Sequence, residues 1–97
     1  MRETWLFDQP GDTMAITTRQ VLHGGAPVLC VAHYSDDHSW AFTCGTTNKE
    51  EDACVVAMEE IVVAHPYLKA VADLPPGWVA TRSSVEAAWQ WVPGDDV

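Results

Sequence analysis

The chain has 97 residues and a formal charge of −9, because 14 Asp and Glu residues outnumber 5 Lys and Arg residues; this acidic balance argues against a nucleic-acid-binding protein. Apolar residues make up 47% of the chain and charged residues 20%, which is typical of a globular domain and excludes disorder. The length allows one modest core, so we expect a single domain over residues 1–97, with loosely packed segments at about 1–12 and 84–97.

The first part of the chain predicts two short strands and a short helix. Residues 4–7 are mostly apolar and aromatic and precede a turn-forming run with Pro and Gly, which indicates an edge strand. Residues 13–16 form a second short strand. Thr17 or Thr18 can then cap a helix over 19–22, which ends at a pair of glycines.

The centre of the chain predicts a β-hairpin. Residues 26–34 contain an uninterrupted apolar run that is partly β-branched, which is typical of a strand covered on both faces and therefore central in its sheet. After a polar loop, residues 40–44 alternate so that Trp40, Phe42 and Cys44 share one face. We therefore expect Trp40 and Phe42 in the core.

The second half predicts a strand, two short helices and a last strand. Residues 54–58 resemble a buried strand, although a helical apolar stripe competes with that interpretation, and we prefer a strand followed by a helix from 59. A second short helix over 67–72 and a last strand over 78–82 follow, and the tail beyond is expected to fray. Together these elements predict an α+β fold, with a small, mostly antiparallel sheet of four to six short strands and two or three short helices.

Three features bear on the cellular compartment. No apolar run approaches the roughly 20 residues that span a bilayer, and the N-terminus lacks an apolar stretch of signal-peptide length. Cys30, Cys44 and Cys54 show no Cys-x-x-Cys spacing and lie in apolar, strand-like surroundings. We therefore expect buried, reduced thiols in a cytoplasmic protein that does not contact a membrane.

The only local cluster of metal-ligating residue types is His33, Asp36, Asp37 and His38. A strand end and a hairpin loop can bring two imidazoles and a carboxylate together, yet Asp is also what a solvated turn uses. A nucleophilic Cys–His pair is disfavoured because the cysteines lie in predicted core strands, where a thiolate is desolvated. We expect no metal, no cofactor and no catalytic residue, and hence no enzyme.

One alternative is a small ligand-binding protein or enzyme with a pocket near His33, His38, Trp40 and Arg82. Arg82 is one of only five basic residues. Its apolar stem and charged head suit a residue that reaches the surface or forms a salt bridge at a strand edge, and anion binding is the functional alternative. A deep pocket that unites these four side chains would favour this hypothesis.

The acid and tryptophan content favours a protein-binding surface. Trp is enriched in cores and in interface hot spots, and acidic patches accelerate association with basic partners. Trp5, Trp89 and Trp91 lie near the termini, where a small core cannot easily enclose them, so at least one could cover a partner. The acidic candidates for the same surface are Glu50, Glu51, Asp52, Asp36 and Asp37.

Three motifs in order carry a family resemblance. Residues 17–25 read Thr-Thr-Arg-Gln-Val-Leu-His-Gly-Gly, residues 36–45 contain Asp-Asp-His-Ser-Trp-Ala-Phe, and residues 74–82 begin Leu-Pro-Pro-Gly-Trp and end in Arg. Over about 13–82 the chain resembles a family of small bacterial proteins of unknown function grouped with immunity-protein-like domains. It departs from the family pattern at 45–48, where Gly-Thr-Thr-Asn replaces an acidic segment.

The resemblance implies a non-enzymatic α+β domain suspected of neutralising toxins by binding them, with no established catalytic residues. We therefore expect a protein-binding module whose partner is another protein, with a basic toxin as the specific candidate. Neither nucleic acid nor a membrane is an expected partner. A homodimer joined through an edge strand is a third hypothesis, since short sheets leave backbone groups unpaired.

Overall fold

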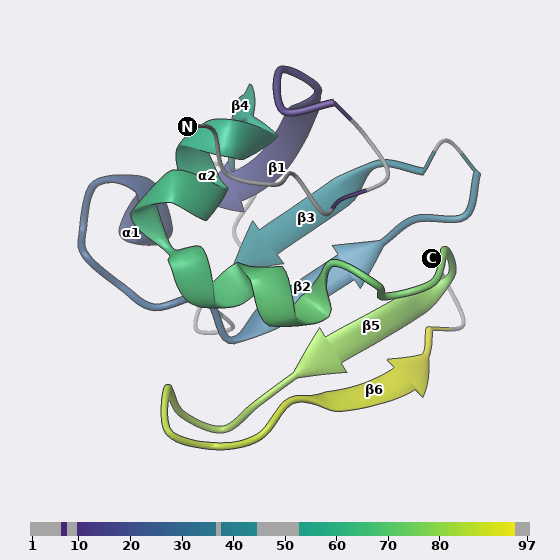
Figure 1. The fold of residues 1–97 in the computed structure, drawn as a ribbon. Coiled ribbons are helices and arrows are strands. Elements are labelled where there is room, and N and C mark those ends of the chain that lie inside the picture. The colour runs from purple at the N-terminus through teal and green to yellow at the C-terminus, as the bar shows by residue number, and fades with distance from the viewer. Residues whose placement is uncertain (1–6, 8–9, 37, 45–52, 95–97) are drawn as a thin grey trace, which may run out of the picture.

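The computed structural model describes residues 7, 10–36, 38–44 and 53–94. Within these residues, six strands form one sheet in the order β4-β1-β3-β2-β5-β6, accompanied by three short helices (Figure 1). The α+β class predicted from the sequence is confirmed. The elements are β1 (Met14–Thr18), α1 (Arg19–Leu22), β2 (Cys30–His33), β3 (Trp40–Thr43), β4 (Ala53–Ala57), α2 (Met58–Ala64), the 3₁₀ helix η2 (Pro66–Val71), β5 (Trp78–Thr81) and β6 (Gln90–Pro93).

The sheet is mixed but mostly antiparallel. The predicted hairpin is present, with Val31 opposite Phe42 in the antiparallel pair of β2 and β3. β1 lies parallel to β3, with Ile16 beside Ala41, and antiparallel to β4 on its other side. β5 and β6 continue the sheet beyond β2 in antiparallel fashion. β2 is therefore central, as its apolar run predicts.

The core lies between one face of the sheet and the helices. Figure 1 shows α2 and η2 crossing in front of the sheet. Trp40 and Phe42 point into this layer and are fully buried, so the prediction that both are core residues is confirmed. Phe7 packs edge-on against Trp40, with ring centroids 5.0 Å apart. The helices contribute the buried side chains Met58, Ile61, Val62, Leu68 and Val71.

Local chemistry explains the boundaries between β4, α2 and η2. Glu59 and Glu60 occupy the first turn of α2, where carboxylates interact favourably with the positive end of the helix dipole. Pro66 lacks an amide hydrogen and ends the α-helical pattern, so the chain continues as the short η2. The preferred order, strand first and helix second, is confirmed. Gly77 has φ 86°, which favours glycine in the turn that starts β5.

Three predictions about individual strands were wrong. β4 is not a buried strand but the edge of the sheet, and Val55 is 64% exposed. The tail after 82 does not simply fray, because Gln90–Pro93 pairs with β5. The central strand begins only at Cys30, since the amide of Val28 already bonds the hydroxyl of Tyr67. An apolar run indicates burial, but it does not show which strand lies at an edge.

The strand expected near the N-terminus, the absence of a membrane span and the cap of the first helix can each be compared with the described residues. Most of the strand expected at 4–7 lies outside the described residues, although Phe7 itself is buried. None of the helices in the described part of the chain is long and apolar enough to cross a membrane. Thr18 occupies the N-cap position of α1 as predicted, but its side chain makes no capping hydrogen bond.

Candidate functional site

The structure brings His33, Trp40 and His38 together at the β2–β3 hairpin. His33 and Trp40 are register partners, and their rings stack with centroids 3.9 Å apart and planes 17° apart. The His38 ring meets His33 edge-on at 5.9 Å, from a loop position with φ 60°. His33 Nδ1 lies 2.7 Å from the carbonyl oxygen of Leu74, and since a carbonyl only accepts, Nδ1 carries the hydrogen.

His33 and Trp40 belong to the core, whereas His38 is exposed in the hairpin loop. His33 is 2% exposed and Trp40 is fully buried. A ligand would have to displace the stacked rings to reach either side chain. The hydrogen bond from His33 to Leu74 and the stacking on Trp40 therefore hold the segment after η2 against the hairpin. These two rings do not line an open pocket.

Arg82 does not join this cluster, so the four-residue pocket expected near His33, His38, Trp40 and Arg82 is not formed. The amide of Arg82 bonds the carbonyl of Leu29, just before β2 begins. His33 ends β2, four residues later, which corresponds to about 13 Å along an extended chain. The physical reason is strand direction: β5 runs antiparallel to β2, so Trp78 pairs with His33 and Arg82 lies at the opposite end.

Arg82 instead lies between two aromatic rings. Its guanidinium carbon is 4.4 Å from the ring centre of Tyr67 and 4.5 Å from that of Trp89. Nε and one terminal nitrogen donate to the carbonyl of Val28 at 3.3 and 3.1 Å, and the other nitrogen donates to that of Val85 at 3.2 Å. We call Arg82, Tyr67 and Trp89 the arginine clamp.

The clamp is extended by a hydrogen-bonded chain through Tyr67. The Tyr67 hydroxyl accepts from the amide of Val28 at 2.8 Å and lies 2.9 Å from Nδ1 of His65. The clamp thereby connects η2, the approach to β2 and the segment before β6. The contacts of the Arg82 guanidinium are with backbone carbonyl oxygens and aromatic rings. They correspond neither to the salt bridge nor to the anion binding considered for Arg82 from the sequence.

The terminal tryptophans differ in their surroundings. Trp89 is half-buried, packs against the core and covers Arg82. Trp91, on β6, is 37% exposed. Trp5 lies outside the described residues. Of the two described tryptophans near the C-terminus, Trp91 is therefore the one that is more accessible to a partner.

The acidic candidates lie mostly beyond the described residues. Glu50, Glu51 and Asp52 fall there, as does Asp37. Asp36 is exposed in the hairpin loop. Within the described ranges, no group of three His, Cys, Asp or Glu residues is placed to hold a metal ion.

The three cysteines, all of them described, form no disulfide, and they differ in burial: Cys44 is buried, whereas Cys30 and Cys54 are only partly so. Burial raises the pKa of the Cys30 thiol, although a hydrogen bond with Thr43 partly opposes the shift. Strand alternation places Cys30 and His33 on opposite faces of the sheet, which separates this thiol from the imidazole. The expected buried thiols are thus confirmed for Cys44 alone.

A further surface, which the sequence interpretation missed, lies on the sheet face opposite α2 and η2. Met14, Ile16 and Val55 are 59%, 39% and 64% exposed, and Ile16 is the register partner of Val55. We call these three side chains the open-face patch. The signal for it was the alternation within 14–17, where the large apolar residues Met14 and Ile16 alternate with the buried Ala15 and Thr17.

Comparisons with known proteins provide no relative for this chain. No protein-family model, no curated protein and no solved structure matches it. Its function is therefore inferred from the contacts, exposure and charges of the described residues.

Proposed function

We propose that this chain is a non-enzymatic protein-binding module, and that its partner is a basic protein. The observation that carries the proposal is the open-face patch. Apolar side chains that remain exposed side by side mark interaction surfaces in small folded proteins. The resemblance to immunity-protein-like domains makes a basic toxin the specific partner we propose.

The composition of the patch suits a protein interface. Met14 has a flexible, polarizable side chain that adapts to a partner surface, whereas Ile16 and Val55 are stiff and branched. Directly opposite side chains on neighbouring antiparallel strands have Cβ atoms about 4.5–5.5 Å apart, so Ile16 and Val55 form one continuous apolar area.

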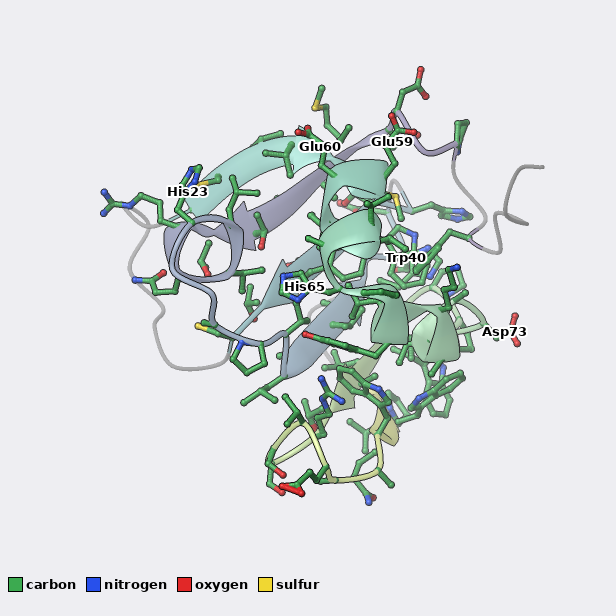
Figure 2. The ribbon with its side chains drawn as sticks, turned by 60° about the vertical axis from the view of Figure 1, so that its left-hand side comes forward. His23, Trp40, Glu59, Glu60, His65 and Asp73 are labelled. Carbon is green, nitrogen blue, oxygen red and sulfur yellow. The ribbon has the colours of Figure 1, made fainter. Side chains whose placement is uncertain are left out.

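The charge distribution supports a basic partner. Exposed carboxylates follow or precede the strands of the patch in sequence: Glu59 and Glu60 come just after β4, in the first turn of α2, and Asp12 precedes β1. Figure 2 shows Glu59 and Glu60 at the same end of α2, well away from Asp73. With a total charge of −9, the chain attracts cationic proteins over a Debye length of about 8 Å at 0.15 M salt.

The polar clusters of the described residues support binding over catalysis. The imidazole of His33 is stacked and hydrogen-bonded in the core, and Arg82 is held by two carbonyl oxygens and two rings. Burial raises the pKa of the Cys30 thiol, which disfavours the thiolate that a nucleophile requires. These groups stabilise the fold, and they offer little to a substrate.

Site-specific photo-crosslinking in the cell tests the proposal. A benzoylphenylalanine at position 14 reports on the patch, and the same residue at exposed Val85, at the other end of the sheet, is the matched control. We expect a defined crosslink to a basic protein from position 14 only. The purified partner should then associate more slowly as salt rises. Absence of any protein crosslink from position 14, or equal crosslinking from both positions, would overturn the proposal.

A further inference from the structure

The outer edge of β4 presents backbone groups that face away from the sheet. The amide of Met58 donates to the carbonyl of Thr13, so this pair marks a hydrogen-bonded position in the antiparallel ladder of β1 and β4. Hydrogen-bonded and non-hydrogen-bonded pairs alternate along such a ladder. Cys54 and Val56 therefore bond toward β1, and Val55 directs its amide and carbonyl outward.

Ala53 shares the orientation of Val55, because it lies two residues away. Both residues also place their side chains on the face of the open-face patch. In the described part of the chain, β4 pairs only with β1 and ends the sheet. Among the described residues, the outer side of β4 can therefore accept another strand. This side is continuous with the exposed open-face patch.

The residues of β4 lack the devices that usually protect an edge strand. Natural edges carry lysine, proline, a bulge or an inward-pointing charge, whereas β4 reads Ala-Cys-Val-Val-Ala over five residues. Strand addition to such an edge is a recurrent mode of peptide recognition, in which main-chain hydrogen bonds provide affinity.

The charges at the ends of β4 select the partner. The exposed carboxylates of Glu59 and Glu60 follow the strand, and the amide of Glu59 bonds the carbonyl of Gly11, which holds this turn beside the start of β1. At the other end, Thr18 pairs with Ala53 and is followed by the exposed Arg19. A second copy of the chain would bring two charges of −9 together, so this distribution favours a strand that is basic where it meets Glu59 and Glu60.

We propose that β4 accepts an antiparallel strand from a partner protein, and that this strand has a β-branched, apolar centre and basic residues at its N-terminal end. The inference rests on the proposed function and specifies how the partner is held. Antiparallel pairing is slightly more stable than parallel pairing, and it places the N-terminal end of the added strand beside the carboxylates. The side chains of the added strand that point to the open face would extend the patch of Met14, Ile16 and Val55.

The probe is a capped peptide, Lys-Lys-Val-Thr-Val-Thr-Val, and its control replaces both lysines with Glu. We expect the lysine peptide to bind the full chain, with affinity that falls as salt rises, and the Glu peptide to bind at least about tenfold more weakly. Glu59→Gln with Glu60→Gln should remove most of that difference, whereas Glu86→Gln, an exposed acid in the loop before β6, should leave it unchanged.

Two variants at one position test the backbone pairing. Val55→Pro removes an amide that faces away from β1, so it breaks no bond within the sheet, and we expect it to weaken peptide binding about fivefold or more. Val55→Thr keeps the amide and nearly the shape of the side chain, so it should bind much more tightly than Val55→Pro and only slightly more weakly than the wild type, because its hydroxyl makes the open-face patch less apolar. If Val55→Pro fails to fold, a peptide N-methylated at its central valine probes the same hydrogen bonds on the wild-type chain. Amide exchange should show Val55 protected only in the peptide complex, and Val56 protected throughout.

The outcomes separate this inference from the proposed function. Equal binding by the wild type and by Val55→Pro, or no binding of the lysine peptide at millimolar concentration, overturns strand addition, while crosslinking from position 14 tests protein binding independently. If the wild type self-associates and Val55→Pro does not, the strand added to β4 comes from a second copy of the chain. That result would overturn the proposal of a basic partner. Loss of binding in Val55→Pro with retention in Val55→Thr supports the inference.

Discussion

Among the described residues, β4 and β6 are both edge strands with one antiparallel neighbour each, yet they present different groups to solvent. The amide of Gly94 bonds the carbonyl of Gly77, so ladder alternation turns Trp91 and Pro93 outward on β6. Proline has no amide hydrogen, which leaves this edge with a single outward donor, at Trp91. On β4 the outward positions include Ala53 and Val55, which both keep their amides.

The segments next to the two edges also differ: the one beside β6 is fixed by specific contacts, whereas the one beside β4 leaves apolar side chains exposed. Behind β6, Arg82 and its two rings tie the loop before the strand to η2 and to the carbonyl of Val28. Next to β4, the side chains of Met14 and Ile16 remain exposed. In the part of the chain that the structure describes, the sheet thus has one edge that lacks an outward amide at Pro93 and is tied to η2 by Arg82, and another edge that keeps its outward amides beside exposed apolar side chains.

The largest expected change in the free energy of unfolding comes from the hydrophobic core, between the two edge strands. Phe42→Ala removes a fully buried ring and leaves a cavity, so it should lower the free energy of unfolding by about 3 to 5 kcal/mol. Val55→Ala, on the edge strand β4, should change it by less than about 0.5 kcal/mol. Urea unfolding of both variants measures the contrast. Similar losses for the two would mean that Val55 is buried in solution.

The next largest effect concerns the edge at β6. Arg82→Lys keeps the charge but cannot stack between two rings or reach both carbonyls, and we expect it to cost about 1–2 kcal/mol of unfolding free energy. Trp89→Leu should reproduce part of that loss. Val85→Ala is the control, since it truncates an exposed side chain and leaves the carbonyl in place. A lysine variant as stable as the wild type would show that the clamp does not stabilise this edge.

Sequence reasoning succeeded where a pattern is local. The alternation of Trp40 and Phe42 identified the hairpin face, and the helix expected from 59 is α2, which begins one residue earlier, at Met58. It failed on which strands lie at the edges, because the order of strands depends on pairings between segments far apart in the chain. The resulting errors were a buried β4 and a fraying tail at 90–93.

The candidate site was predictable only in part for the same reason. Pairing across the hairpin brings His33 beside Trp40, so their proximity follows from one local turn. Arg82 was expected near that cluster, but β5 runs antiparallel to β2, so Arg82 lies at the other end of β2. The clamp unites Tyr67, Arg82 and Trp89 from separate elements, and no local pattern predicts such a contact.

A smaller, pH-dependent effect involves Cys30, on the face that the patch shares. Because burial raises the pKa of this thiol, the folded state holds its proton more tightly than the unfolded chain does. The associated stability is therefore complete below the unfolded pKa of about 8.5 and is lost as pH rises through the higher folded value. Urea unfolding between neutral and alkaline pH should show a steeper decline for the wild type than for Cys30→Ala. Parallel declines would contradict the raised pKa.

The smallest expected effect comes from making β6 resemble β4. Pro93 is exposed, and its nitrogen faces away from β5, so Pro93→Val adds an outward amide without disturbing the ladder. Loss of proline increases the freedom of the unfolded chain, while valine favours a strand, and the net change in unfolding free energy should stay within about 1 kcal/mol.

The variant should nevertheless self-associate weakly at high concentration, because its outward edge then offers amides at both Trp91 and position 93. Sedimentation velocity over a concentration series measures this, with Val92→Thr as the control, since that residue bonds toward β5. If Pro93→Val sediments like the wild type at all concentrations, the missing amide is not what protects β6, and the arginine clamp becomes the better explanation for the difference between the two edges.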